Sequence, residues 1–194
     1  MSPTEGGPIP SEAARSLVGA LRFCRFDRTA ASAFDPSPAA ALRSFWAAFY
    51  GLPFYAVALA LGLWHSPHRP DDLWLYALVQ VIAYVAHTAA FPLGVLGLAR
   101  LLGHVAQWPL FVTAQNWFGL PQVVALLVCV TLDQTGVLGP VGLALLLAVQ
   151  LYSFAVEGFI SWATLGVKPL AAFAIVLLDI VIGFGIDELT AGLF

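Results

Sequence analysis

The sequence predicts an all-α fold: a polytopic membrane helix bundle of five transmembrane helices, preceded by a short amphipathic N-terminal helix. Of the 194 residues, 60% are hydrophobic and only 10% are charged, and the mean hydropathy is +0.88. A soluble domain averages about 25% charged residues. The apolar residues are concentrated in five long stretches separated by short polar turns. Because a water-soluble chain of this size could not bury so much apolar surface, lipid is expected to be the solvent for much of it.

The five apolar stretches have lengths that suit a bilayer. A helix needs about 20 apolar residues to cross the hydrocarbon core. The expected spans cover residues 45–64, 73–99, 111–132, 141–162 and 169–186. Within the third stretch, Pro121 and the polar pair Gln115 and Asn116 interrupt the apolar run. Short loops with turn-forming residues separate the spans, so residues 41–194 are expected to form one five-span membrane domain.

Residues 1–40 are expected to form a cytoplasmic N-terminal segment. Its first ten residues are rich in Pro and Gly and are expected to be disordered. No apolar segment follows them directly, so no cleavable signal peptide is expected. A turn precedes the first span, and either Asp35 or Ser37 could cap the helix that follows it.

A short amphipathic helix is predicted over about residues 11–26, with Ser11 as its N-cap. Its apolar residues recur with helical spacing at Ala14, Leu17, Val18, Leu21 and Cys24. The other side of this helix is a predicted membrane-surface basic face, formed by Arg15, Arg22 and Arg25. A basic amphipathic helix is typical of a segment that lies on the membrane. Docking of the helix onto the protein's own spans is the alternative.

The basic residues predict the orientation of the spans. Cytoplasmic loops of membrane proteins carry an excess of Lys and Arg. With the N-terminus in the cytoplasm, seven of the eight Lys and Arg residues fall on the cytoplasmic side, and only Arg69 falls outside. Five spans then place the C-terminus in the periplasm. The Ala- and Leu-rich, cysteine-poor composition favours a multi-pass protein of the bacterial inner membrane, with the lipid bilayer as its first partner.

Ionisable residues within the spans mark an expected polar centre. Such residues cost roughly 2.5–3.5 kcal/mol to insert and usually face protein or water. The last two spans carry Glu157 and Asp179, and the hairpin that they form is expected to organise the chain. From the helical rise, Asp179 is expected about 15 Å and Glu157 about 8 Å from the cytoplasmic end of its span. We expect Asp179 to find a hydrogen-bonding partner in the second or fourth span. The candidate centre comprises His87, Asn116, Gln150, Glu157 and Asp179.

Three roles remain open for this centre. The polar groups could hydrogen-bond across helices and fix the packing of the bundle. Alternatively, they could relay protons or ions through Glu157, Asp179 and His87. Two carboxylates and one His could also hold a metal ion, but no Glu-x-x-His pair supports that role, and no metal is expected. A second polar group lies in the first outer loop, where it could bind a divalent metal weakly, although a solvated loop is the simpler expectation: His65, His68, Asp71 and Asp72.

Composition and missing motifs argue against several other functions. The net charge of −3 argues against nucleic acid as a partner. The two cysteines, Cys24 and Cys129, lie in different surroundings and form no disulfide framework. The serines near His87 have no nucleophile elbow or oxyanion glycines around them. No catalytic residue is therefore assigned, and no cofactor is expected.

The layout and two stretches of the chain resemble the Yip domain family of five-span membrane proteins. Residues 111–117, Phe-Val-Thr-Ala-Gln-Asn-Trp, resemble the polar-aromatic start of the third span in small bacterial members. Residues 157–167 are similar to their last hairpin, where an aromatic-rich helix end meets a short Leu-Gly-Val turn. The resemblance covers roughly residues 40–190. Eukaryotic members associate with Ypt/Rab GTPases, a partner that is not expected to carry over to a bacterial chain.

The resemblance implies a non-catalytic integral membrane protein with an interaction, accessory-subunit or membrane-organising role. Its partners would be lipid, another membrane protein or further copies of this chain. The alternative is a small oligomeric transporter or channel that uses the Glu157, Asp179 and His87 centre. Five spans lack the two-fold repeat that is common in transporters, which counts against this alternative. A water-filled cavity joining Asp179 to one surface would favour transport, whereas a dry packed cluster would favour a structural role.

Overall fold

The computed structural model describes residues 10–66, 69–139 and 141–193, and these residues are helical apart from short turns and loops. The expected disorder of the N-terminal residues falls on 1–9, outside the described residues. Within the described part, five helical segments are long and apolar enough to cross a membrane: Pro38–His65, Leu73–Leu102, Val105–Gln134, Val141–Leu165 and Pro169–Ala191. The predicted class, an all-α multi-pass membrane bundle with a short N-terminal helix, is confirmed.

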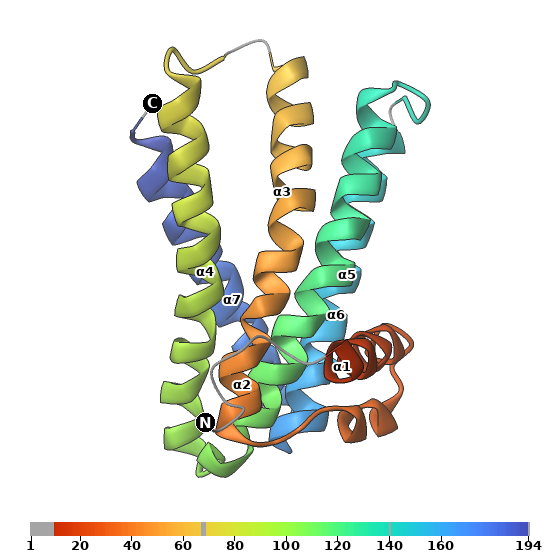
Figure 1. Cartoon of the computed structure of the whole chain (residues 1–194), viewed down its shortest axis with the longest axis vertical. Helices are drawn as coiled ribbons and strands as arrows, with labels where there is room; N and C mark the ends of the chain where they lie inside the picture. The colour runs from red at the N-terminus through yellow and green to blue at the C-terminus, as the bar shows by residue number, and fades with distance from the viewer. Residues whose placement is uncertain (1–9, 67–68, 140, 194) are drawn as a thin grey trace.

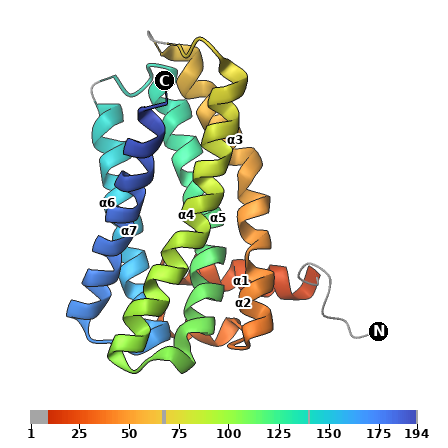
Figure 2. The same ribbon diagram turned by 90° about the vertical axis from the view of Figure 1, so that its left-hand side faces the viewer.

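The helices follow one another with short connections. In chain order they are α1 (Pro10–Phe23), the 3-10 helix η1 (Arg28–Ala33), α2 (Pro38–Ser44), α3 (Trp46–His65), α4 (Leu73–Leu102), the 3-10 helix η2 (Val105–Gln107), α5 (Trp108–Gln134), α6 (Val141–Leu165) and α7 (Pro169–Ala191). The long helices run along the long axis of the molecule, and α1 lies across them near the end where α4 joins α5 and α6 joins α7 (Figures 1 and 2). The C-terminal end of α7 lies at the opposite end.

The spans extend further than the apolar pattern predicts. Helix α6 ends at Leu165 rather than at 162, and α7 ends at Ala191 rather than at 186. Apolar composition marks where lipid ends, whereas the backbone hydrogen bonds of a helix continue into the polar interface. Thr164 illustrates this, since its hydroxyl donates to the Ile160 carbonyl at 2.7 Å instead of breaking the helix. Helix α4 ends at Leu102 and is capped by Gly103, whose φ of 77° suits a residue without a side chain.

Helix α5 lies at the centre of the bundle. It packs against α3, α6, α1 and α2, and more lightly against α4. No residue in its first half is exposed, and five of its apolar residues are buried: Phe111, Val112, Ala114, Trp117 and Phe118. The expectation that the last hairpin organises the chain is therefore wrong. The polar and proline residues that interrupt the apolar run of α5 point to this central position, because such residues are tolerated in a span when protein rather than lipid surrounds them.

Helices α4 and α7 form a second packed pair. Gly94 of α4 lets Leu178 and Ile182 of α7 approach closely, since a Cβ there would lie 3.1 Å from Leu178. Gly183 of α7 in turn lies opposite His87 of α4. Small residues at such crossings allow close helix approach in membranes. This packing brings the middle of α4, which carries His87, against the middle of α7, which carries Asp179.

Helix α1 docks onto the protein's own spans, which is the second of the two predicted alternatives. Its buried face consists of Ser16, Gly19, Ala20 and Phe23 and packs on α5, η1 and α6. The predicted apolar stripe remains largely on the outside, with Val18 57% and Leu21 48% exposed. The docking face was missed because Ser, Gly and Ala carry little hydrophobic signal, although small side chains allow close packing.

The end of α1 also differs from the prediction. The helix begins at Pro10, so Ser11 lies inside it, and it ends at Phe23 rather than near residue 26. Phe26 adopts a positive φ of 54°, which stops the helix, and Asp27 then caps η1 by accepting a hydrogen bond from the Thr29 amide. Arg22 donates to the Asp27 carboxylate at 2.8 Å. Of the predicted basic face, Arg22 is therefore ion-paired, whereas Arg15 and Arg25 are exposed.

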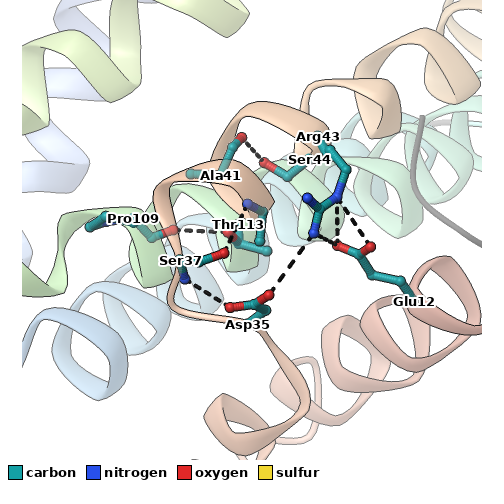
Figure 3. Close-up of polar contacts among 9 residues, drawn as sticks. Glu12, Asp35, Ser37, Ala41, Arg43, Ser44, Pro109 and Thr113 are labelled. Atoms are coloured by element: carbon teal, nitrogen blue, oxygen red, sulfur yellow. Dashed lines mark hydrogen bonds and ion pairs between the residues drawn. The ribbon is translucent and has the colours of Figure 1, made fainter. Parts of the chain in front are cut away.

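A charged clamp fixes α1 to the start of the first span (Figure 3). The Arg43 guanidinium donates to both carboxylate oxygens of Glu12, at 3.0 to 3.3 Å, and lies 3.9 Å from Asp35. Ser37 caps α2 by accepting from the Ala40 amide, and Asp35 accepts from the Ser37 amide. Both predicted capping residues are thus used, one on the helix and one on the turn before it.

Candidate functional site

A cavity of about 260 Å³ lies among the five spans, between α3, α4, α5, α6 and α7. All five residues of the predicted polar centre line it: His87, Asn116, Gln150, Glu157 and Asp179. They come from four helices and from positions up to 92 residues apart in the printed sequence. The bundle thus gathers its intramembrane polar residues around one space.

His87 of α4 and Asp179 of α7 form the central contact of the cavity. His87 Nε2 lies 3.2 Å from Asp179 Oδ1. The predicted partner of Asp179 in the second span is therefore confirmed. The two side chains differ in exposure, since His87 is 38% and Asp179 only 15% exposed. Asp179 is thus the more buried member of the pair.

Glu157 is the most buried of the three ionisable residues. Its side chain is only 2% exposed, and its carboxyl lies beside that of Asp179. Because α6 continues to Leu165, Glu157 lies about 12 Å from the end of its helix, closer to the depth of Asp179 than predicted. Two carboxyl groups that lie side by side disfavour being ionised together. Glu157, Asp179 and His87 therefore form one cluster of proton-binding groups.

Several polar atoms at or beside the cavity lack a hydrogen-bond partner within the part of the chain that the structure describes. They are Gln115 Oε1, Glu157 Oε1 and Ser161 Oγ. The first two belong to residues that line the cavity. Both are oxygens that accept hydrogen bonds, so what they lack is a donor.

Carboxamide side chains also line the cavity. Gln115, Asn116 and Gln122 line the cavity from α5, and Gln150 lines it from α6. Asn116 is anchored, because its Nδ2 donates to Ser44 Oγ at 2.8 Å. Gln150 is exposed. The prediction of the centre missed Gln115 and Gln122, although their spacing with Gly119 of four and three residues places all three on one helix face.

Two tyrosines close the side formed by α3 and α4, and sequence reasoning did not assign either to a site. The Tyr55 and Tyr84 rings stack with centroids 4.8 Å apart. Tyr55 donates to Gln80 Oε1 at 3.2 Å, and Tyr84 donates to the Ala48 carbonyl at 3.0 Å. Tyr84 lies on the face of α4 that includes His87, three residues away, and this spacing is the signal that could have found it.

The residues do not form a metal centre. Among the described residues, no group of three or more His, Cys, Asp or Glu side chains could hold a metal ion. The metal-binding alternative for Glu157, Asp179 and His87 therefore has no support. Of the outer-loop group, His68 lies outside the described residues, and Asp72 serves as the N-cap of α4 by accepting from the Trp74 and Leu75 amides.

No family model, curated protein or solved structure matches the chain. The resemblance to the Yip domain family stays a prediction. What the described residues define is a class: a multi-pass membrane protein with a polar cavity inside its bundle.

Proposed function

We propose that the protein is a small membrane transporter in which Glu157, Asp179 and His87 bind and pass protons at a solute-binding cavity. One observation carries this proposal. Three ionisable groups from three helices line one cavity, and one of them, Glu157, has a buried carboxyl oxygen without a donor among the described residues. A purely structural polar cluster would be expected to satisfy its own hydrogen bonds.

The energetics support a binding role. A buried polar atom without a partner costs about 1–3 kcal/mol. Two acceptor oxygens of this kind belong to Gln115 and Glu157, which line the same cavity. Glu157 and Asp179 also place two carboxyl groups on this wall, which favours a ligand that donates hydrogen bonds or carries positive charge. A proton-coupled amine or another small hydrogen-bond donor fits this wall better than an anion does.

The arrangement also supplies a route for protons. His87 is the most exposed of the three ionisable groups, Asp179 lies between the other two, and Glu157 is fully buried. A proton taken up at His87 can pass to Asp179 across 3.2 Å and from there to Glu157. Charged residues in membrane spans recur in such relays.

We also propose an orientation and a location for the protein. The end of the bundle with α1 and Lys168 faces the cytoplasm, because nearly all of the basic residues belong to it. The bacterial inner membrane is the proposed location. A non-catalytic accessory or membrane-organising role, which is what the Yip-like resemblance implies, is the alternative proposal, and it needs neither the cavity nor its unpartnered oxygens.

Proton uptake into liposomes tests the proposal. The purified protein is reconstituted with an internal pH-sensitive dye, and an inward proton gradient is imposed. Wild-type protein should acidify the lumen faster than empty liposomes do, and Asp179→Asn, which keeps the shape but not the proton chemistry, should abolish the difference. The matched control is Glu188→Gln, which removes an exposed acid of the same helix and should leave the flux unchanged. Wild-type flux equal to that of empty liposomes, or full flux in a folded Asp179→Asn protein, would refute the proton relay.

A further inference from the structure

A second hollow lies on the outside of the bundle, between α6 and α7. It is an apolar groove of about 430 Å³ that begins beside the turn between the two helices. Its lining consists of Phe154, Ala155, Gly158, Phe159, Trp162, Pro169, Ala172, Phe173 and Val176. The groove is separate from the polar cavity, and the two share no lining residue.

Two cations frame the end of the groove that lies by the turn. The Arg28 guanidinium lies over the ring of Trp162, 4.4 Å from its centroid, and Trp162 lines the groove. Lys168 is exposed and directly precedes Pro169, the first lining residue of α7. Arg22 and Arg43 are neutralised by Asp27 and Glu12, whereas no ion pair of Arg28 or Lys168 occurs in the described part of the chain. Two uncompensated positive charges thus lie where an apolar groove meets the membrane surface.

We propose that this groove binds one anionic phospholipid, with an acyl chain against α6 and α7 and its phosphate between Arg28 and Lys168. Basic pockets between membrane helices on the cytoplasmic side bind anionic head groups. Trp162 lies at the level where an aromatic ring favours the boundary between head groups and acyl chains. The guanidinium of Arg28 is held in place by its ring contact, so less side-chain entropy is lost when it binds a phosphate.

A second copy of the chain fits this groove less well. Copies in one bilayer share the same orientation, so the basic end of one copy meets the basic end of the next. Exposed Arg15, Arg25 and Lys168 belong to that end in every copy. Like charges at the same depth repel, whereas an anionic head group complements them. Charge complementarity therefore selects a lipid as the occupant.

Quenching of tryptophan fluorescence by brominated lipids tests the proposal. The full-length protein is reconstituted in phosphatidylcholine vesicles that contain a small fraction of either brominated phosphatidylglycerol or brominated phosphatidylcholine. Wild-type protein should show stronger, saturable quenching by the anionic lipid. In Trp162→Phe this excess should disappear, which assigns it to the groove.

Variants of the cations and of the groove separate the two parts of the site. Each of Arg28→Gln and Lys168→Gln should weaken the preference for phosphatidylglycerol about fivefold, the factor that corresponds to about 1 kcal/mol per basic residue at an anionic surface. Arg15→Gln removes an exposed charge from the N-terminal half of α1 and serves as the matched control. Its preference for phosphatidylglycerol should equal that of the wild-type protein. Ala155→Leu should reduce quenching by both lipids, because it fills the groove without removing a charge.

Three outcomes would overturn the lipid site. Equal quenching of wild-type protein by the two lipids would show that no anionic lipid is selected. The same preference in the Arg28→Gln, Lys168→Gln double variant would show that these cations do not hold the head group. Conversion of a detergent-solubilised oligomer into a monomer by Ala155→Leu would show that a second copy occupies the groove. None of these results depends on proton flux, so the lipid site and the proposed function are tested separately.

Discussion

At the scale of single residues, Glu157 shows most clearly how burial and function oppose each other. Its side chain is 2% exposed, and one carboxyl oxygen has no donor within the described residues. Such an atom costs about 1–3 kcal/mol of stability unless a donor binds to it. A residue that is unfavourable for stability but central to the proposed relay is therefore a direct test of the proposed function.

We predict that Glu157→Met raises thermal stability in detergent while it abolishes proton uptake. Methionine fills a similar volume and removes the unpartnered oxygen, and replacing a buried polar group by an apolar one of similar shape can be stabilising. Thermal unfolding monitored by tryptophan fluorescence measures the first effect, and liposome flux measures the second. A large loss of stability would instead mean that Glu157 is a structural hydrogen-bonding group.

Asp27 lies outside the membrane spans, and the lowered pKa of its carboxyl predicts how the turn at this residue responds to pH. Hydrogen bonds from the Thr29 hydroxyl, from Arg22 and from the Thr29 amide stabilise its ionised form and lower the pKa of this carboxyl. A lowered folded pKa means that the contribution to the turn is fully present above the unfolded value, about 3.9. It is lost as the pH falls through the lower folded value. The Thr29 amide resonance should therefore titrate below the usual Asp range, and Asp27→Asn should abolish that titration. A midpoint at or above the usual value would contradict the capping geometry.

At the scale of elements, α1 is a docked helix rather than a free membrane anchor. Phe23 and Phe26 contact Phe159 of α6, with ring centroids 6.1 and 5.4 Å apart. The Tyr152 hydroxyl of the same helix donates to the Cys24 carbonyl. At its other end, Arg43 and Glu12 hold α1 to the first span. The helix is thus fixed at both ends, and its exposed Val18 and Leu21 remain free to meet lipid.

Breaking the clamp should loosen α1 without unfolding the bundle. Hydrogen bonds to charged groups contribute about 1.5–3 kcal/mol, so Arg43→Gln should lower the hydrogen-exchange protection of α1 about tenfold or more. Protection of α5 should not change. Arg15→Gln, which removes an exposed charge of α1, provides the control. Unchanged protection of α1 in Arg43→Gln would show that the buried face of Ser16, Ala20 and Phe23 alone holds the helix.

The differences between prediction and structure at this scale have a common physical origin. Long apolar runs identify the spans, but they do not mark helix ends, as Thr164 and Leu165 of α6 show. Large apolar side chains identify a stripe, but close packing is made by small residues such as Gly19 and Ala20. The expected partner of Asp179 in the second or fourth span agrees with its contact to His87, because the helical rise that sets the depth of a residue is a property of the backbone. Which helix faces which is set by the whole bundle, so the contribution of Tyr55 to the cavity could not be predicted.

At the scale of the whole molecule, a polar cavity is built into an apolar bundle by one central helix. Helix α5 carries Gln115, Asn116 and Gln122 into the interior while its other faces pack against α3 and α6. The predicted five spans follow from hydropathy alone. The central position of α5 does not follow from hydropathy, because the apolar pattern of one span does not show which other spans it contacts.

The charge distribution predicts the topology of the intact protein. We expect α1 and the loop at Lys168 in the cytoplasm and the end of α7 in the periplasm. Alkaline phosphatase fused after residue 194 should be active, and the same enzyme fused in the loop after Gly103 should be inactive. The converse pattern would reverse the orientation, and activity at both sites would contradict an odd number of spans.

Water access to the cavity tests the central claim most directly. Cys24→Ser and Cys129→Ala remove the native thiols, and Gln150→Cys or Leu151→Cys then introduces one new thiol. Gln150 lines the cavity, whereas Leu151 is the next residue of α6, lies at nearly the same depth and is 67% exposed on the bundle. A membrane-impermeant thiol reagent reacts with thiolate, which forms in water and not in hydrocarbon. The account predicts rapid labelling of Gln150→Cys and none of Leu151→Cys, and an unreactive Gln150→Cys protein would contradict it by showing that the polar cluster is dry.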